Sequence, residues 1–232
     1  MVGYAGFIKS SFIDFPKTIS AVVFVDGCNF RCPYCHNSEL LCKKESKMFS
    51  ESEIFNYCIK KKNFLDGVVF SGGEISLYEE SITLMEKLKE FGFKIKIDTN
   101  GTHPLFIKKL VDQNIVDYIA MDVKAPLDKY SKVAGVDVDI DAIVESIDLI
   151  KKSGVDYEFR TTICRELHDK QDIIEIGKLL DGADKFVLQN FKDGKNVLLG
   201  EGKFTSFEAY EFKKLAQLFE RYISNVSYRL NQ

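Results

Sequence analysis

Tryptophan is absent from the 232 residues, and proline occurs only four times. The 19 phenylalanines and the aliphatic residues must therefore build the core. With no low-complexity tract, long disordered segments are not expected. No apolar run reaches the roughly 18 residues that would span a membrane. The first residues lack the charged and then apolar pattern of a secretion signal. We therefore expect a cytoplasmic protein that makes no membrane contact.

A strong charge of either sign is also missing. The 32 Lys and Arg residues against 35 Asp and Glu residues leave a net charge of −3. This balance argues against nucleic-acid binding through a broadly basic surface. The hydrophobic fraction of 45% is enough for a sizeable core. Because no linker rich in Pro, Gly or Ser interrupts the sequence, we predict a single domain over residues 1–232.

The six cysteines are unevenly spaced. An even number could form three disulfides in a secreted protein. However, three of them lie within eight residues, while the others are dispersed as Cys42, Cys58 and Cys164. Without a secretion signal we expect reduced thiols. Three clustered thiols in such a setting usually hold an inorganic group.

Short apolar runs alternate with helical patterns along the chain. Ser50-Glu51-Ser52-Glu53 has the pattern of a capping box, and Gly92 is a typical helix stop. Repeated β–α units predict parallel strands with helices outside, as a doubly wound sheet or an open barrel. The predicted strands are Ala21–Val25, Gly67–Phe70, Lys94–Ile97, Tyr118–Met121, Tyr157–Ile163, Lys185–Leu188 and Val226–Leu230. The predicted helices are residues 50–62, 81–91, 104–111, 141–152, 173–180 and 207–222.

Polar clusters follow almost every predicted strand. Because ligands of such folds bind at the carboxyl ends of the strands, we expect these clusters to carry the chemistry. They are Asp26-Gly27-Cys28, Ser71-Gly72-Gly73-Glu74, Asp98-Thr99-Asn100-Gly101, Asp122-Val123-Lys124, Cys164-Arg165 and Gln189-Asn190.

The clustered cysteines form the pattern Cys28-x3-Cys32-x2-Cys35. Thiolates are soft ligands that suit iron–sulfur clusters and zinc. Structural zinc requires four ligands, commonly from two Cys-x2-Cys pairs, and the chain has no second pair. Ordinary ferredoxin clusters also use four cysteines, so three on a four-iron cluster would leave one iron open. A zinc site that recruits Cys42 remains the alternative.

The cysteine pattern, with the aromatic Tyr34 before Cys35, resembles the signature of radical S-adenosylmethionine (radical SAM) enzymes. Gly72-Gly73-Glu74, at the end of the next predicted strand, resembles the element by which that family holds the amino group of SAM. The resemblance implies a [4Fe–4S] cluster on the three cysteines and a SAM that chelates the open iron. One electron then cleaves SAM to methionine and a 5′-deoxyadenosyl radical.

Longer stretches resemble one subgroup, the activating proteins of anaerobic ribonucleoside-triphosphate reductases. Pyruvate formate-lyase activating enzyme is a close relative of that subgroup, and both abstract hydrogen from a glycine of a partner enzyme. The resemblance covers nearly the whole chain and implies a partial, open (β/α)6 barrel of the TIM type. It also implies a glycyl radical enzyme as partner and a flavodoxin or ferredoxin-type electron donor. The matching stretches are residues 6–16, 35–40, 98–101, 121–126, 160–162 and 187–191.

The resemblance assigns roles residue by residue. Tyr34 and His36 would lie beside the SAM adenine, and Gly72, Gly73 and Glu74 would approach the amino group. Lys124 would contact SAM, while Arg160 and Gln189 or Asn190 would line the far side of the pocket. A monovalent cation next to the SAM carboxylate would be held by Asp98, Thr99, Met121 and Asp122. Asp98 and Asp122 belong to the cofactor pocket as well.

Several simpler readings stay open at this point. Asp98 could be only a turn residue, and Lys124 a surface lysine. Arg160 could pair with Glu158 or a neighbouring acid. We expect His103 to start a helix and His168 to be an exposed loop residue. Cys164 has no expected role. It lies directly before the position at which these relatives carry a Pro-Gly turn, which this chain lacks.

Three alternative functions compete with the activation of a ribonucleotide reductase. The first is activation of pyruvate formate-lyase or another glycyl radical enzyme. The second is small-molecule chemistry, as in 7-carboxy-7-deazaguanine synthase. The third is metal binding or electron transfer without catalysis.

Overall fold

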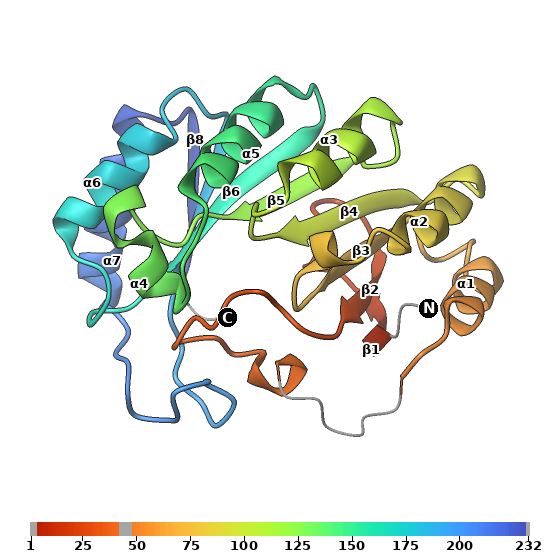
Figure 1. Ribbon diagram of the computed structural model, residues 1–232, viewed down its shortest axis with the longest axis horizontal. Coiled ribbons are helices and arrows are strands. Elements are labelled where there is room, and N and C mark those ends of the chain that lie inside the picture. The colour runs from red at the N-terminus through yellow and green to blue at the C-terminus, as the bar shows by residue number, and fades with distance from the viewer. Residues whose placement is uncertain (1–3, 42–47, 231–232) are drawn as a thin grey trace.

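The computed structural model describes residues 4–41 and 48–230, so Cys42 and the predicted zinc alternative lie outside the described residues. One eight-stranded sheet forms the body of the molecule, with the strands in sequence order (Figure 1). Strand β1 runs antiparallel to β2, and every later pair is parallel. The strands are β1 (Tyr4–Ser11), β2 (Ser20–Val25), β3 (Gly67–Gly72), β4 (Lys94–Thr99), β5 (Tyr118–Asp122), β6 (Asp156–Ile163), β7 (Lys185–Asn190) and β8 (Asn225–Arg229).

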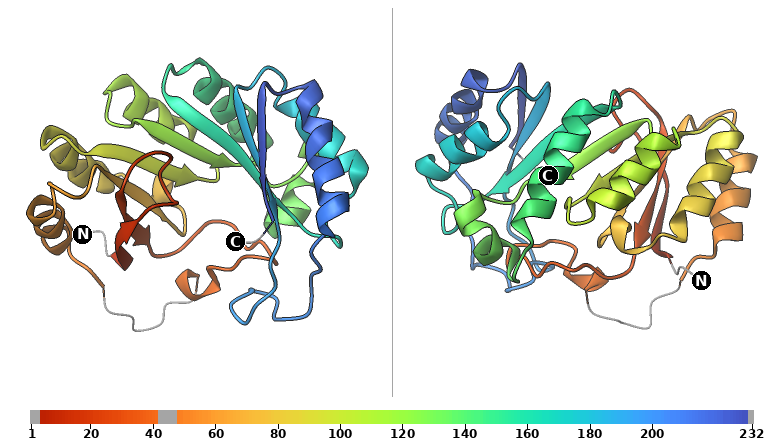
Figure 2. Two further views of the ribbon diagram at one scale, coloured as in Figure 1. Left: turned by 180° about the vertical axis from the view of Figure 1, so that it is seen from behind. Right: turned by 45° about the horizontal axis from the view of Figure 1, so that its top comes forward.

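The helices cover the outer, convex face of the curved sheet, as Figure 2 shows from behind and with the top of the molecule turned forward. Within the described sheet β1 and β8 do not pair with each other, so the barrel stays open. The predicted α/β fold with an open barrel is thus confirmed. The α-helices are α1 (Glu51–Lys60), α2 (Ser81–Glu90), α3 (Pro104–Asp112), α4 (Tyr130–Ala134), α5 (Ile140–Lys152), α6 (Lys170–Leu179) and α7 (Ala209–Leu218). The short 3-10 helices are η1 (Ser38–Leu40), η2 (Ile75–Leu77), η3 (Leu127–Lys129) and η4 (Phe219–Arg221).

Local sequence signals account for the helix boundaries. Helix α1 begins with the predicted capping box, in which the Ser50 hydroxyl accepts the Glu53 backbone N–H and the Glu53 carboxylate accepts that of Ser50. Helix α3 begins at Pro104, directly after His103, as expected. Helix α2 ends before Gly92, whose φ of 81° suits glycine. None of the helices in the described part of the chain is long and apolar enough to cross a membrane.

Strand β1 was not predicted. Its sequence, YAGFIKSS, lacks strict alternation and contains a glycine, and three of its eight residues are exposed. It forms the edge of the sheet and pairs with β2 through a register shift on each side of its central residues. Its strand conformation depends on β2, which its own pattern does not reveal. The segment 6–16, which resembled the start of the activases, therefore begins as a strand and continues as a loop after Ser11.

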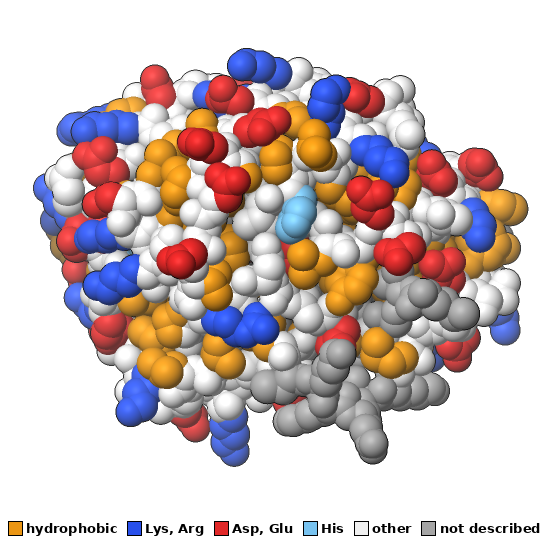
Figure 3. Space-filling view, in the orientation of Figure 1, with side chains coloured by type: hydrophobic (Ala, Val, Ile, Leu, Met, Phe, Trp, Pro, Cys, Tyr) orange, Lys and Arg blue, Asp and Glu red, His pale blue; other side chains and the backbone are white. Residues whose placement is uncertain are grey.

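The inside of the curved sheet is apolar at one end and polar at the other. Phe15, in the loop after β1, is 4% exposed, and its ring centroid lies 5.9 Å from that of Tyr118 on β5. With Val22, Val69 and Ala120 these rings form a small core of their own. This core closes the amino-terminal end of the barrel. Charged side chains of both signs are interspersed over the outer surface (Figure 3), in keeping with the small net charge.

Candidate active site

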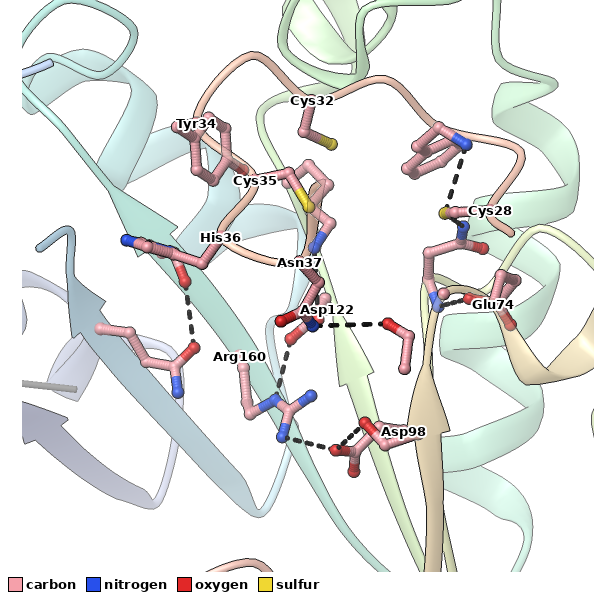
Figure 4. A pocket seen from close by; sticks show the side chains of 18 of the residues that line it. Cys28, Cys32, Tyr34, Cys35, His36, Asn37, Glu74, Asp98, Asp122 and Arg160 are labelled. Atoms are coloured by element: carbon pink, nitrogen blue, oxygen red, sulfur yellow. Dashed lines mark hydrogen bonds and ion pairs between the residues drawn. The ribbon is translucent and has the colours of Figure 1, made fainter. Parts of the chain in front are cut away.

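A cavity of about 900 Å³ opens at the carboxyl ends of the parallel strands, beneath the loop that carries the cysteines (Figure 4). The structure brings the sequence-predicted site residues together here, with one exception, Met121. Those that line the cavity are Cys28, Cys32, Tyr34, Cys35, His36, Gly72, Gly73, Glu74, Asp98, Thr99, Asp122, Lys124, Arg160, Gln189 and Asn190.

The cysteine loop is anchored by backbone hydrogen bonds to two distant segments. The Arg31 N–H donates to the Ala134 carbonyl over 2.8 Å. On the other side, the N–H groups of Leu198 and Leu199 donate to the carbonyls of Cys35 and Pro33, both over 3.0 Å. The position of the thiols therefore depends on the tertiary fold and not on the loop alone.

The three thiols of this loop are free and face the cavity (Figure 4). Cys32 is 7% exposed, while Cys28 and Cys35 are half-buried. Burial raises the pKa of Cys28 to about 11 and that of Cys32 to about 12. Without a bound cation these two thiols therefore stay protonated at neutral pH.

Glu74 is a buried carboxylate at the end of β3. Its Oε1 accepts the Ser76 backbone N–H (3.0 Å), the Ser76 hydroxyl (2.6 Å) and the Thr99 hydroxyl (2.7 Å). Its Oε2 accepts the Asn100 N–H over 2.7 Å. Burial raises the pKa of Glu74 although these hydrogen bonds lower it. Because Oε2 accepts one hydrogen bond from the described residues, it keeps a lone pair for a cationic ligand group.

Gly73 explains why glycine precedes this carboxylate. A Cβ built there would lie 1.6 Å from the carbonyl oxygen of Gly27. The Glu74 N–H donates to the same oxygen over 2.9 Å. Two strand-end loops thus touch backbone to backbone, and any side chain at Gly73 would separate them.

A chain of charged side chains forms the floor of the cavity. Asp98 accepts the Lys96 ammonium on Oδ1 and the Ser71 hydroxyl, 3.0 Å away, on Oδ2. Arg160 lies between the two aspartates, with Nη1 3.5 Å from Asp98 Oδ2 and Nε 2.8 Å from Asp122 Oδ1 (Figure 4). Lys124 Nζ lies 3.2 Å from Asp122 Oδ2.

Strand register produces this arrangement. Asp122 on β5 pairs directly with Arg160 on β6, so both side chains point into the barrel. Burial alone would raise the pKa of Asp98, but the charges of Arg160 and Lys96 lower it overall. Burial also acts to raise the pKa of Asp122, but the charges of Arg160 and Lys124 outweigh it and hold this pKa well below its usual range. Both carboxylates are therefore ionised at neutral pH.

The structure decides between the readings that the sequence left open for three residues. Arg160 pairs with the neighbouring acids Asp98 and Asp122. Glu158 instead accepts the Tyr118 hydroxyl over 3.0 Å. Lys124 is not a surface lysine, because its side chain is 19% exposed and lies in the cavity wall. Asp98 is more than a turn residue, as its two ion pairs show.

Met121 does not join the predicted cation ligands in the cavity. Its side chain is fully buried in the main core and packs against Gly101, because adjacent residues of a strand point to opposite faces. Thr99 does line the cavity, but its hydroxyl donates a hydrogen bond to Glu74. The predicted four-residue set is thus not assembled as side chains.

The aromatic residues of the cysteine loop take different positions. His36 stacks on Phe191 with ring centroids 5.1 Å apart. Tyr34 is 4% exposed and meets the rings of His168 and Phe204 edge-on. Among the described residues, the Tyr34 hydroxyl has no hydrogen-bond partner.

At the end of β7 the two amide side chains have different partners. The Asn190 side chain bonds the Phe207 backbone: it donates to the carbonyl over 2.8 Å and accepts the N–H over 3.0 Å. Gln189 accepts the Thr162 hydroxyl over 3.1 Å. Asn190 therefore fixes the segment around Phe207, and Gln189 is the more available of the two.

Sequence reasoning missed two buried residues of this region. Lys96 was treated as an ordinary strand residue, although its position two residues before Asp98 places both on one face. His168 was expected to be exposed but is 2% exposed. No local signal marks His168, because the loop after β6 buries it only in the folded chain.

The profile of the radical SAM superfamily matches residues 22–181. The chain belongs to the radical SAM superfamily. It is 37% identical over 230 residues to a protein of Methanocaldococcus jannaschii named as a glycyl-radical enzyme activating enzyme. The match covers 97% of this chain and 95% of that protein. Two partial matches are the pyruvate formate-lyase-activating enzyme of Clostridium pasteurianum and the 7-carboxy-7-deazaguanine synthase of Koribacter versatilis. The first is 38% identical, and the match covers 36% of this chain and 37% of that enzyme. The second is 34% identical, and the match covers 62% of this chain and 61% of that enzyme.

A solved structure agrees on the fold. Streptococcus suis SuiB bound to its precursor peptide SuiA superposes with a TM-score of 0.70 at 14% identity. The match covers 90% of this chain and 48% of that one, so the radical SAM chain spans about half of SuiB. Members of the superfamily use a [4Fe–4S] cluster and SAM, which confirms the predicted cofactors and an enzyme of this kind. The predicted similarity to glycyl-radical-enzyme activases is confirmed at the level of the class.

Proposed function

We propose that this radical SAM protein activates a glycyl radical enzyme, with its cluster on Cys28, Cys32 and Cys35 and its SAM in the cavity below. One observation carries the proposal. Three thiols share a cavity with a carboxylate on one wall, Glu74, and two cations on the other, Lys124 and Arg160. These are the partners that an iron–sulfur cluster and a zwitterionic amino acid require.

The donor set fits an iron–sulfur cluster. Among the described residues, no group of three or more His, Cys, Asp or Glu side chains is placed to hold a single metal ion. The three thiols lie on one loop and face the cavity (Figure 4). Soft donors spaced in this way suit a polynuclear cluster better than zinc, with the fourth iron left to a ligand.

The cavity walls fit the methionine moiety of SAM. Glu74 Oε2 would accept the amino group, since its other hydrogen bond comes only from Asn100. The Lys124 ammonium donates one N–H to Asp122, so its other N–H groups are left for the carboxylate of the amino acid. Arg160, fixed between Asp98 and Asp122, supplies the second positive charge. The two walls would therefore fix the orientation of the amino acid, with its amino group toward Glu74 and its carboxylate toward Lys124 and Arg160.

The remaining contacts would hold the nucleoside. We assign the adenine to the side of the cavity near Tyr34 and His36, where aromatic rings stand in the wall. Gln189 is the amide that would reach the ligand, because Asn190 is engaged with Phe207.

When bound, the cluster and SAM supply the 5′-deoxyadenosyl radical that abstracts a hydrogen atom from glycine. The chain's own contribution is orientation and exclusion of water. Glu74, Lys124 and Arg160 fix the amino acid, and Gly73 permits the close approach of its loop. The apolar core of Phe15 and Tyr118 closes the cavity from below.

The partner we favour is an anaerobic ribonucleoside-triphosphate reductase, with a flavodoxin or ferredoxin as electron donor. The support lies in the motifs of residues 6–16 and 187–191, which resemble that subgroup of activases. Pyruvate formate-lyase is the second candidate, favoured by the partial match to its activating enzyme. Small-molecule chemistry is a third, favoured by the partial match to 7-carboxy-7-deazaguanine synthase.

The test is anaerobic reconstitution followed by incubation with SAM, a reductant and each candidate partner. The activase should produce a doublet glycyl-radical signal by electron paramagnetic resonance. Cys32→Ala should abolish both cluster and signal. The matched control Cys58→Ala, a buried cysteine on α1 outside the cavity, should retain both. Zinc in place of iron with no response to SAM, or no signal with any glycyl radical enzyme of the host, would refute the proposal.

A further inference from the structure

Lys96 is the most deeply buried cationic residue of the cavity region. It lies on β4, faces the inside of the barrel and is 1% exposed. Lysine is almost never buried so completely without a partner. Its ammonium group contacts Asp98 Oδ1, two residues along the strand. Lys96 therefore neutralises Asp98 from below, on the side away from the cysteine loop.

Every carboxylate oxygen of the two floor aspartates already faces a cationic side chain. Asp98 Oδ2 binds the Ser71 hydroxyl and faces Arg160. Asp122 binds Arg160 through Oδ1 and Lys124 through Oδ2. These carboxylates would be the main ligands of the monovalent cation that the sequence resemblance implied. The residues present do not fit such an ion.

The charge balance leads to the same result. Lys96, Arg160 and Lys124 carry three positive charges against the two negative charges of Asp98 and Asp122. The nearby Glu158 is matched by Arg229, whose Nη2 lies 3.9 Å from it. The floor thus has one excess positive charge, which the carboxylate of an amino-acid ligand would neutralise. An added metal cation would restore the excess in a site of low dielectric constant.

We propose that Lys96 takes the place of a monovalent metal cation, so that SAM binds this protein without K⁺ or Na⁺. Lys96 is a positioning residue, since it acts through Asp98 on the Arg160 that faces the ligand. This inference rests on the proposed SAM site. It differs from that proposal in its consequence, which is independence from metal cations.

The first test measures SAM binding to the cluster-loaded protein in KCl, NaCl or tetramethylammonium chloride at equal ionic strength. The wild-type dissociation constant should agree within about 2-fold across the salts. In Lys96→Met the side chain keeps its length and loses its charge. Its SAM affinity should fall by about 10-fold or more in tetramethylammonium and recover in K⁺. Lys89→Met, which removes an ion pair with Asp117 outside the cavity, should show no K⁺ effect.

The second test requires neither SAM nor activity. Crystals soaked in Rb⁺ should show no anomalous scattering between Asp98 and Asp122 in the wild type. A Rb⁺ peak there, or a K⁺ requirement for wild-type SAM binding, would overturn the inference. So would a Lys96→Met protein that binds SAM as the wild type does in every salt. If that variant does not fold, the wild-type salt series and the Rb⁺ experiment decide. Failure to bind SAM in any salt would instead refute the proposed function.

Discussion

The imidazole of His168 donates its Nε2–H to the backbone carbonyl of Lys124, 2.9 Å away. The tautomer follows from the other ring nitrogen, because Nδ1 faces the Cys164 N–H over 3.3 Å and must accept it. One buried histidine thus ties the loop after β6 to the loop after β5. The position of the Lys124 ammonium in the cavity depends on this tie.

Replacing His168 should therefore affect both stability and ligand binding. His168→Ala leaves the Cys164 N–H and the Lys124 carbonyl without partners, which should cost about 1–3 kcal/mol of unfolding free energy. Denaturant titration measures this loss. SAM affinity should also fall, because Lys124 is less well held. An unchanged stability would contradict the role of the tie.

The pH dependence of stability should carry the signature of His168. Burial lowers its pKa from the ordinary value, so the unfolded chain binds a proton that the folded chain does not. Stability should accordingly fall as the pH drops below about 6.5. His168→Gln should lose this component between pH 6.5 and 5. The variant His103→Gln, at the start of α3, serves as control and should keep it.

Glu74→Gln should destabilise the protein whichever way the amide is oriented. In one orientation the amide nitrogen meets the Ser76 backbone N–H, and in the other that of Asn100. Either way one buried donor is left unpaired, at a cost of about 1–3 kcal/mol. Thermal and denaturant unfolding measure the effect. Glu79→Gln, in an exposed ion pair with Lys109, should change stability by less than about 0.5 kcal/mol.

Gly73 should not tolerate a methyl group. Gly73→Ala places a Cβ 1.6 Å from the Gly27 carbonyl oxygen, so the two backbone segments must separate. We expect a loss above about 4 kcal/mol or failure to fold. Gly194→Ala is the matched control, because nothing lies within 4 Å of its Cβ position. It should change stability by at most about 1 kcal/mol. A stable Gly73→Ala protein would show that the loops do not touch.

Acid should weaken the floor of the cavity. The pKa of Asp122 is lowered in the folded protein, so its contribution is present above about pH 3.9 and lost as the pH falls below it. Asp122→Asn should be less stable at neutral pH, and its stability should change less with pH below 4. Its SAM affinity should fall while cluster loading is kept. Asp112→Asn, in an exposed pair with Lys108, should behave as the wild type.

Most of the fold was predictable because seven strands carry their own apolar runs. The predicted strands correspond to β2 through β8, and the α1 start coincides with its capping box. Strand β1 was not predicted, because an edge strand with polar and exposed residues has little pattern of its own. Helix α4, five residues long, is too short for helical periodicity to show.

The site was predictable where chemistry follows a strand and less so where packing decides. The thiols, Glu74 and Asp122 are marked by motifs at strand ends. The partners of Arg160 depend on the register of β5 against β6, which the sequence does not state. Lys96 alternates with apolar neighbours as a surface residue would. In an open barrel the same alternation points it inward.

The anchors of the cysteine loop have a consequence for how the protein matures. Ala134 and the segment at Leu198 and Leu199 hold the loop. Ala134 is translated 103 residues after Arg31, and Leu198 is translated 163 residues after Cys35. The thiols therefore reach their final arrangement only when most of the chain has left the ribosome. Iron–sulfur loading is expected to be a late event, and a chain truncated before residue 198 should accept no stable cluster.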